Sequence, residues 1–150
     1  MNQKMIDGVI VKQLPANCNE QGYFSELIRS DWNIIEKFGQ VFLTAIYPGT
    51  IKAWHYHRSQ IDHFVCVCGS IKLVLYDVRE TSPTNGITNE FMMSESSLQL
   101  IKIPAYVYHG YQCTSPEKAV IINVSTELYK KDNPDEVWLP FDTREIPYQW

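Results

Sequence analysis

Apolar and polar residues alternate along most of this chain with a period of two, in short runs. A period of two is typical of β-strands, whose successive side chains point to opposite faces, whereas amphipathic helices repeat every 3.6 residues. Gly, Pro, Asn and Ser gather between the runs and predict turns. Strands are therefore predicted at 8–14, 22–29, 40–47, 51–57, 63–68, 70–78, 87–93, 98–103 and 119–126.

Many short strands at this spacing predict an all-β sandwich or barrel. A helix is expected only as a single turn, near 30–38 or 94–97. Residues from about 130 to 150 carry prolines and charges, and they predict an extended, irregular C-terminal tail that lies on the domain. No linker or repeat interrupts the pattern, so we expect one domain over residues 1–150.

Composition excludes several classes of protein. With 45% hydrophobic residues the chain can bury a core, and a net charge of −4 without a basic block argues against nucleic-acid binding. No run of about 18 apolar residues predicts a membrane span, and the start lacks the apolar segment of a secretory signal. The four cysteines are interpreted as reduced residues. We therefore expect a cytoplasmic protein whose partners include neither nucleic acid nor membrane.

Three of the four histidines lie close together, in GTIKAWHYHRSQIDHFVCVCG (49–69). On a strand, His55 and His57 point to the same face. Asp62 directly precedes the next predicted strand, and alternation turns His63 to the face opposite Asp62. We therefore expect His63 to lie outside any site that the other three residues form.

A barrel interior can bring the late histidine, His109, to the same cavity as His55, His57 and Asp62. Imidazole and carboxylate groups in this combination form metal shells with nitrogen and oxygen ligands. They equally supply a base, its orienting carboxylate and a polarising group for proton transfer. Both chemistries stay open from the residues alone.

The spacing in this segment resembles the general cupin pattern, in which Gly, five residues, His-x-His, a few residues, a carboxylate, six residues and Gly follow in order. The matching residues are Gly49, His55, His57, Asp62 and Gly69. Pro104 and His109 resemble the second cupin motif. The resemblance implies a cupin jelly-roll (double-stranded β-helix) barrel.

A closer resemblance covers most of the chain and carries several motifs in one order. They are NEQGYFSELIR (19–29), GTIKAWHYH (49–57), QIDHFVCVCG (60–69), DVRETSPTNG (77–86), IPAYVYHGY (103–111) and DTREIPYQW (142–150). These resemble DERGFFSELFR, GTIRGLHYQ, QGKLVRCVRG, DLRRGSPTFG, IPPGFAHGF and DP-IGI-WP of the dTDP-4-dehydrorhamnose 3,5-epimerase family. The chain is identified as a divergent member of that family.

The resemblance implies an epimerase of a nucleotide-linked 4-keto-6-deoxyhexose, which needs no cofactor. Such an enzyme makes a deoxysugar for a surface polysaccharide such as lipopolysaccharide O-antigen. His55 matches the base that removes the proton beside the ketone, and His109 is expected in the same site. Lys52 matches a diphosphate-binding arginine, although alternation places it on the face opposite His55. Glu26 and Gln40 match positions on the nucleotide-sugar side.

Departures from the family motifs shape the expected reaction. Asp62 stands where the family has a lysine that stabilises the enolate oxygen, and Asn123 stands where it has a tyrosine that acts as general acid. The loss of that tyrosine implies epimerisation at carbon 3 only. Asp62 is a candidate to orient His55, while Tyr106 or Tyr108 is a candidate acid, Tyr108 also being expected to bind substrate.

Two alternatives to this epimerase remain from the sequence. One is a metal-dependent cupin enzyme, in which one divalent transition metal is bound by His55, His57, Asp62 and His109. The other is a non-catalytic protein that binds a sugar nucleotide. The family resemblance also implies a homodimer, in which the strand predicted at 8–14 could be exchanged between subunits.

Overall fold

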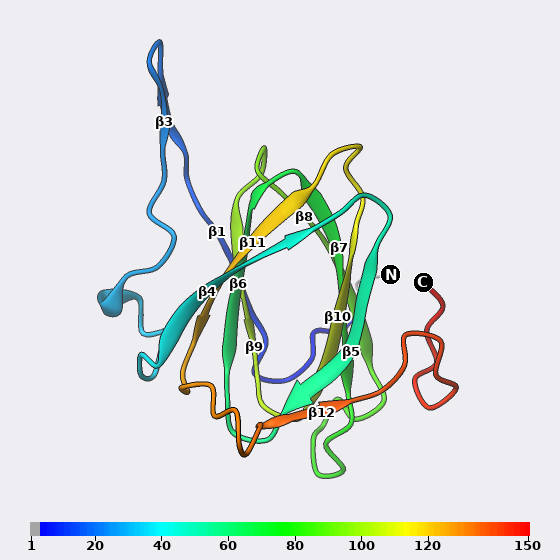
Figure 1. Cartoon of the computed structure of the whole chain (residues 1–150). Coiled ribbons are helices and arrows are strands. Elements are labelled where there is room, and N and C mark those ends of the chain that lie inside the picture. Colours follow the sequence, from blue (N-terminus) through cyan, green and yellow to red (C-terminus); the bar gives the residue numbers. More distant parts are fainter. Residues whose placement is uncertain (1–3) are drawn as a thin grey trace.

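The computed structural model describes residues 4–150, so residues 1–3 of the predicted domain lie outside the described residues (Figure 1). The described strands are β1 (Ile10–Gln13), β2 (Asn17–Asn19), β3 (Gly22–Phe24), β4 (Gln40–Ile46), β5 (Ile51–His57), β6 (Asp62–Cys68), β7 (Ser70–Asp77), β8 (Thr88–Ser94), β9 (Gln99–Ile103), β10 (Val107–Cys113), β11 (Ala119–Ser125) and β12 (Glu136–Trp138). A single 3₁₀ turn, Ser30–Trp32, confirms one of the two expected helical turns.

Two five-stranded sheets face each other and form the barrel. One sheet has the order β1-β9-β6-β11-β4 and the other the order β12-β5-β10-β7-β8. Strands that are distant in sequence are neighbours in each sheet, as in a jelly roll, and Figure 1 shows the sheets curving around a common interior. The all-β jelly-roll prediction is therefore confirmed.

Most predicted strands occur within two residues of their expected bounds, with one exception. In the strand predicted at 22–29 only Gly22–Phe24 is extended, because Leu27 and Ile28 instead pack against the outer face of a sheet. Strands β2, β10 and β12 were not predicted. In β10 six of seven residues are buried, so its two faces do not differ in polarity and no alternation marks it.

Core side chains fill one part of the interior and leave another part hollow. Leu73, Leu75 and Ile101 are fully buried in the main cluster, with other apolar side chains of β7, β8, β9 and β10. The part of the interior bounded by β4, β5, β11 and β12 is instead lined by polar and aromatic groups. The apolar part fixes the two sheets, so the polar part can remain open.

The C-terminal tail covers the outer face of β5 and β10. Trp54 is fully buried there, and its ring lies 5.9 Å from that of Tyr148 and 4.9 Å from that of Trp150. A Cβ added to Gly110 would lie 2.3 Å from the Cβ of Ala53 and 2.8 Å from the Trp150 ring. Glycine at this position therefore allows β5 and the tail to pack closely against β10.

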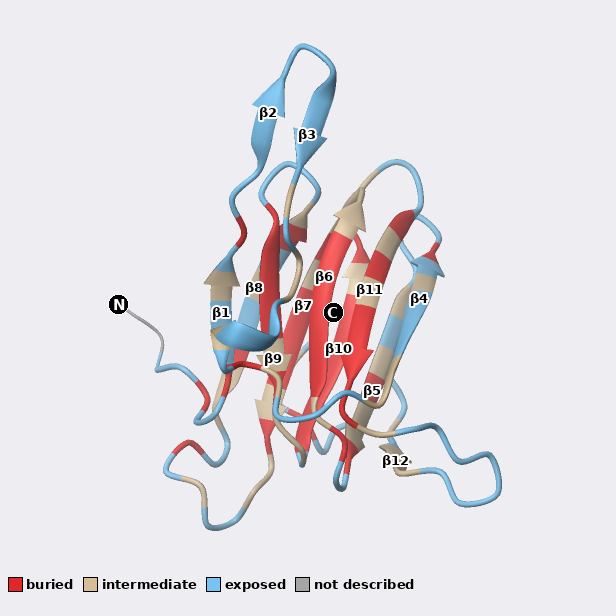
Figure 2. Ribbon diagram, turned by 90° about the vertical axis from the view of Figure 1, so that its left-hand side faces the viewer, coloured by how far each residue is buried: buried red, intermediate tan, exposed pale blue. Residues whose placement is uncertain are grey.

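A β-hairpin of β2 and β3 projects away from the barrel, with both strands exposed along their whole length (Figure 2). The strand predicted at 8–14 appears as β1, and it pairs with β9 of the same chain. No helix among residues 4–150 is long and apolar enough to cross a membrane.

Candidate active site

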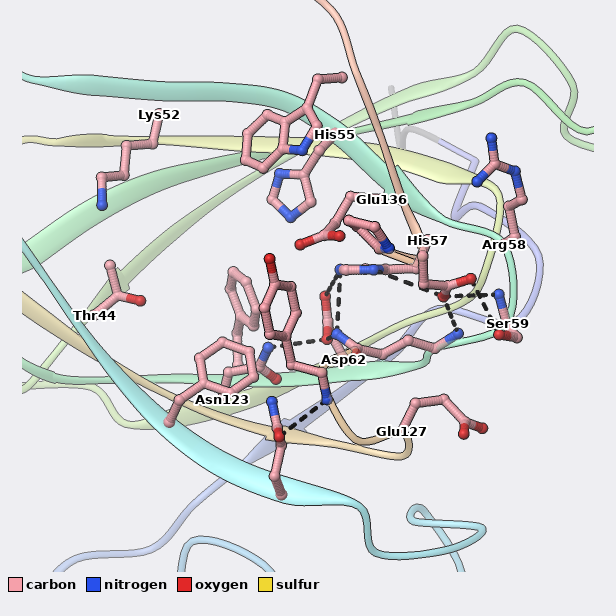
Figure 3. Close-up of a pocket in the computed structure, with 18 of the residues that line it drawn as sticks. Thr44, Lys52, His55, His57, Arg58, Ser59, Asp62, Asn123, Glu127 and Glu136 are labelled. Atoms are coloured by element: carbon pink, nitrogen blue, oxygen red, sulfur yellow. Dashed lines mark hydrogen bonds and ion pairs between the residues drawn. The ribbon is translucent and has the colours of Figure 1, made fainter. Parts of the chain in front are cut away.

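A cavity of about 800 Å³ opens between the sheets and contains the predicted histidine site (Figure 3). Its walls come from β4, β5, β6, β10, β11 and β12 and from the loop that precedes β12. The volume suits a small-molecule ligand, since such pockets span about 300 to 1,000 Å³. Four groups that the sequence predicted to meet do so, with ligating atoms within 4.8 Å of one another: His55, His57, Asp62 and His109.

His55 projects into the cavity from β5 (Figure 3). Its ring stacks on Trp138 at 4.5 Å and lies 4.0 Å from the ring of His109, while its Nδ1 is buried and has no hydrogen-bond partner within residues 4–150. Burial, with the neighbouring His109 and His57, holds the pKa of His55 well below its usual value. His55 is therefore neutral at neutral pH and can accept a proton.

Asp62 is almost fully buried, and each of its oxygens has two neighbours. Oδ1 accepts hydrogen bonds from Gln60 Nε2 at 2.7 Å and Asn123 Nδ2 at 2.9 Å. Oδ2 lies 3.3 Å from Nε2 of both His57 and His109. Burial alone would raise the pKa of Asp62, but these two histidines outweigh it and hold the pKa well below its usual value. Asp62 is therefore an anion at the centre of the cluster.

The expectation that Asp62 orients His55 is wrong. The neighbours of Asp62 Oδ2 are His57 and His109, and no hydrogen bond joins it to His55 among the described residues. Burial acts to lower the pKa of His57, yet Asp62, Glu136 and Asp135 together raise it. Asp62 therefore contacts His57 and His109, and it does not orient His55.

Lys52 lines the same cavity as His55, so the prediction that alternation turns it away is wrong. The pairing of β10 with β5 matches His109 to His55 but Tyr111 to Lys52, which sets three steps on β5 against two on β10. Such a β-bulge shifts the alternation by one residue. The bulge brings the Lys52 side chain to the cavity wall, across from Thr44 (Figure 3).

Two other predicted residues lie outside this cavity. Tyr108 points outward from β10 into the cluster under the C-terminal tail, because its neighbour His109 points inward. Tyr106 also does not line the cavity. The prediction that Tyr106 or Tyr108 is the acid is therefore wrong, as is substrate binding by Tyr108. Glu26 is exposed and paired with Arg29 at 2.6 Å, so it does not reach the cavity of its own chain.

The remaining predictions agree with the geometry. Gln40 lines the cavity, and its Oε1 accepts a hydrogen bond from the backbone of Tyr129 at 3.1 Å. His63 faces away as expected, with its ring nitrogens 2.8 Å from the Val124 carbonyl and 3.3 Å from the Ile34 carbonyl. His63 is therefore a structural residue of the barrel wall.

Tyr111 and Trp138 line the cavity and were not predicted. The Tyr111 side chain comes from β10, and burial raises the pKa of Tyr111 to about 12, although Thr44 of β4 acts to lower it. The signal for it was present, because the family motif IPPGFAHGF has Phe where this chain has Tyr111. Trp138 had no such signal, since it lies in the segment interpreted as an irregular tail.

A jelly-roll barrel with a neutral histidine in a polar cavity defines an enzyme of the cupin class that can move a proton. The family model described as dTDP-4-dehydrorhamnose 3,5-epimerase matches residues 3–150. The chain belongs to this family of sugar-nucleotide epimerases, which confirms the resemblance seen in its motifs.

Individual relatives agree with this assignment. The chain is 42% identical to the spore coat polysaccharide biosynthesis protein SpsL of Bacillus subtilis over 97% of both chains. It is 40% identical to the probable low-salt glycan biosynthesis epimerase Agl13 of Haloferax volcanii, over 97% of this chain and 94% of that one. A dTDP sugar isomerase from Desulfovibrio desulfuricans superposes with a TM-score of 0.91 at 27% identity, covering 97% of this chain and 92% of the other.

Proposed function

We propose that this protein epimerises a nucleotide-linked 4-keto-6-deoxyhexose at carbon 3, with His55 as the base. The observation that carries the proposal is the neutral His55 in the cavity of an epimerase-family barrel. The proton on a carbon next to a ketone is acidic, because the resulting charge is shared with the ketone oxygen as an enolate. A neutral imidazole within reach of that proton can remove it.

Two cations support binding of the diphosphate. Lys52 and Arg58 both line the cavity, and Figure 3 shows them at opposite sides of the histidine cluster. Phosphate oxygens are bound well by such side chains. Because Thr44 and Gln40 lie on the wall formed by β4, we place the nucleotide along that wall, with the sugar next to His55.

Tyr111 is the proton donor in this proposal. Asn123, at the family tyrosine position, bonds to Asp62 and to the backbone of His63, so it is held by the barrel. The hydroxyl that position 123 lacks is present instead at Tyr111. Tyr111 comes from β10 and His55 from the neighbouring strand β5, and both side chains line the cavity. Inversion of a carbon needs a base and a donor on opposite faces of it, so we place the Tyr111 hydroxyl on the face of the sugar opposite His55.

Deuterium exchange tests the reaction and its position. We expect NMR in deuterium oxide to show exchange of the proton at carbon 3 and slow or no exchange at carbon 5. The substrates are 4-keto-6-deoxyhexoses linked to dTDP, CDP or GDP, which also identifies the nucleotide. Exchange at neither carbon with all three would contradict the epimerase, while equal exchange at both would contradict the restriction to carbon 3.

The names of the two relatives support a role in supplying a deoxysugar for a surface polysaccharide or glycan. We assign this role in the cytoplasm, where sugar nucleotides are made. The lipopolysaccharide O-antigen is one polysaccharide that such a sugar would enter.

We also infer a homodimer. β4 is an edge strand, and its residues Val41 and Leu43 alternate with residues that line the cavity. These two residues are 52% and 61% exposed. The projecting hairpin adds Tyr23 and Phe24, at 56% and 64% exposed. Exposure of these apolar groups to water is unfavourable, and a second copy of the chain would cover them. It would also give the segment around Glu26 a route to the partner subunit's cavity.

Sedimentation tests the dimer. We expect wild-type protein to sediment as a dimer and Leu43→Glu to sediment as a folded monomer, because a buried unpaired carboxylate opposes association. Met92→Glu is the matched control, since Met92 is 58% exposed on β8 of the other sheet. The inference fails if the wild type is monomeric, or if both variants remain dimeric.

A further inference from the structure

We propose that His57, Asp62 and His109 bind one divalent transition metal, with an open coordination position that faces the cavity beside His55. Metal binding is a property of these three side chains and stands without the proposed function. The role of the metal in the reaction rests on the proposed function. Two imidazoles and one carboxylate with an open position are typical of catalytic zinc and non-haem iron sites.

The spacing of the three groups fits a metal. Oδ2 of Asp62 lies 3.3 Å from Nε2 of His57 and 3.3 Å from Nε2 of His109. Metal bonds of about 2.1 Å in a tetrahedral arrangement place neighbouring ligand atoms about 3.4 Å apart. The two observed separations are close to this value and longer than a good hydrogen bond between an imidazole and a carboxylate.

The hydrogen atoms around His109 also point to a cation. Nδ1 of His109 lies 3.1 Å from the carbonyl oxygen of Val107, which can only accept, so this nitrogen carries the hydrogen. Because Nδ1 makes this contact, Nε2 is the ring nitrogen left to bind a metal. That atom is buried, has no hydrogen-bond partner among the described residues and lies 3.3 Å from Oδ2 of Asp62. A metal between the two atoms gives both of them a partner.

His57 presents its Nε2 in the same way. The Gln60 amide nitrogen donates to Asp62 Oδ1 at 2.7 Å, because a carboxylate oxygen only accepts, and this contact fixes the orientation of the amide. The same nitrogen lies 3.2 Å from Nε2 of His57. Nε2 of both histidines lies 3.3 Å from one carboxylate oxygen, Oδ2 of Asp62.

Hydrogen bonds from neighbouring groups orient two of the three ligands, as in known metal sites. A ligating histidine usually donates its other ring N–H to a carbonyl or carboxylate. His109 does so to Val107, whereas Nδ1 of His57 has no hydrogen-bond partner among the described residues and lies 3.8 Å from the Asp135 carboxylate. Gln60 and Asn123 bind Oδ1 of Asp62, which leaves Oδ2 for the metal.

These residues are also where the chain differs from the family motifs. His57 replaces the Gln of GTIRGLHYQ, Asp62 replaces the Lys of QGKLVRCVRG, and Asn123 bonds directly to Asp62. Because these three substituted residues form one contacting group, a single new site explains them better than three unrelated losses of family residues. A metal bound here supplies positive charge near His55, where it can stabilise an enolate oxygen.

Metal binding is measured on untagged full-length protein. We expect elemental analysis to find about one transition metal per chain. After chelation, titration with Zn²⁺ or Co²⁺ alone restores one equivalent, raises the unfolding temperature and, for Co²⁺, produces visible absorption of a site with nitrogen ligands. His57→Asn and His109→Asn lose at least about tenfold in affinity. His63→Asn, a buried histidine outside the cluster, retains the metal.

His55→Asn separates this proposal from the proposed function. We expect this variant to retain the metal and lose deuterium exchange, whereas metal removal from the wild type slows exchange and added Zn²⁺ or Co²⁺ restores it. Less than about a tenth of an equivalent after titration overturns the site, as does binding that His57→Asn and His109→Asn leave unchanged. Loss of the metal in His55→Asn overturns the three-ligand assignment. Metal bound without any exchange leaves the site in place and overturns the proposed function and the role built on it.

Discussion

The His55→Asn variant is expected to lose deuterium exchange at carbon 3 of the substrate by at least about a thousandfold, the upper part of the range for removal of a general base. Asn has no lone pair basic enough to accept a proton from carbon. It is close to His in size, so the stacked position against Trp138 and the contact with His109 remain largely filled. NMR in deuterium oxide measures the rate, and binding of the unreacting nucleoside diphosphate should change little.

His63→Asn is the matched control, because His63 is a fully buried histidine on β6, in the other sheet, whose ring nitrogens contact the backbone carbonyls of Val124 and Ile34. This variant is expected to be less stable, since Asn cannot reach both carbonyls, but to exchange at the wild-type rate when folded. Exchange by His55→Asn at a rate within about tenfold of the wild type would show that another group is the base.

Tyr111→Phe is expected to form the inverted sugar about 10² to 10⁴ times more slowly while still exchanging deuterium at carbon 3. His55 remains to remove and return a proton on its own face, so label enters. Inversion needs a donor on the other face, and the variant lacks that hydroxyl. Because the family motif has Phe at this position, the barrel should accept the change with little loss of stability.

Tyr108→Phe serves as the control, since it makes the same change one residue away on β10, with the side chain on the outer face. It should leave both exchange and inversion close to wild type. If Tyr111→Phe inverts the sugar as fast as the wild type, the donor is another group, and the relocation of the hydroxyl from position 123 to position 111 is wrong.

Short-range alternation was sufficient for most of the barrel. Some of the strands that the pattern marked, such as β5, have faces that differ in burial, so a period of two is visible, whereas β6 and β9 are largely buried on both faces and were marked as short apolar runs between turns. β10 lacks this contrast because the C-terminal tail buries its outer face. β12 lacks it because the strand has only three residues and lies along the cavity edge.

In the candidate site too, the sequence identified some residues correctly and misplaced another. His55, His57 and Asp62 were identified because motif spacing and alternation place them on inward faces, and His109 because it follows a recognisable second motif. Lys52 was assigned to the wrong face, since one extra residue at the bulge between β5 and β10 reverses the alternation. A bulge depends on how two strands pair, and the sequence of one strand does not contain that information.

The sequence by itself determined the jelly-roll barrel, the family and the four residues that converge in the cavity, because strand alternation and motif spacing are local properties of the chain. The tertiary structure decided which of these residues act on one another. It placed Asp62 between His57 and His109 and not beside His55, and it brought the Tyr111 side chain into the cavity wall. Such contacts join strands from distant parts of the chain, so they depend on sheet order and register.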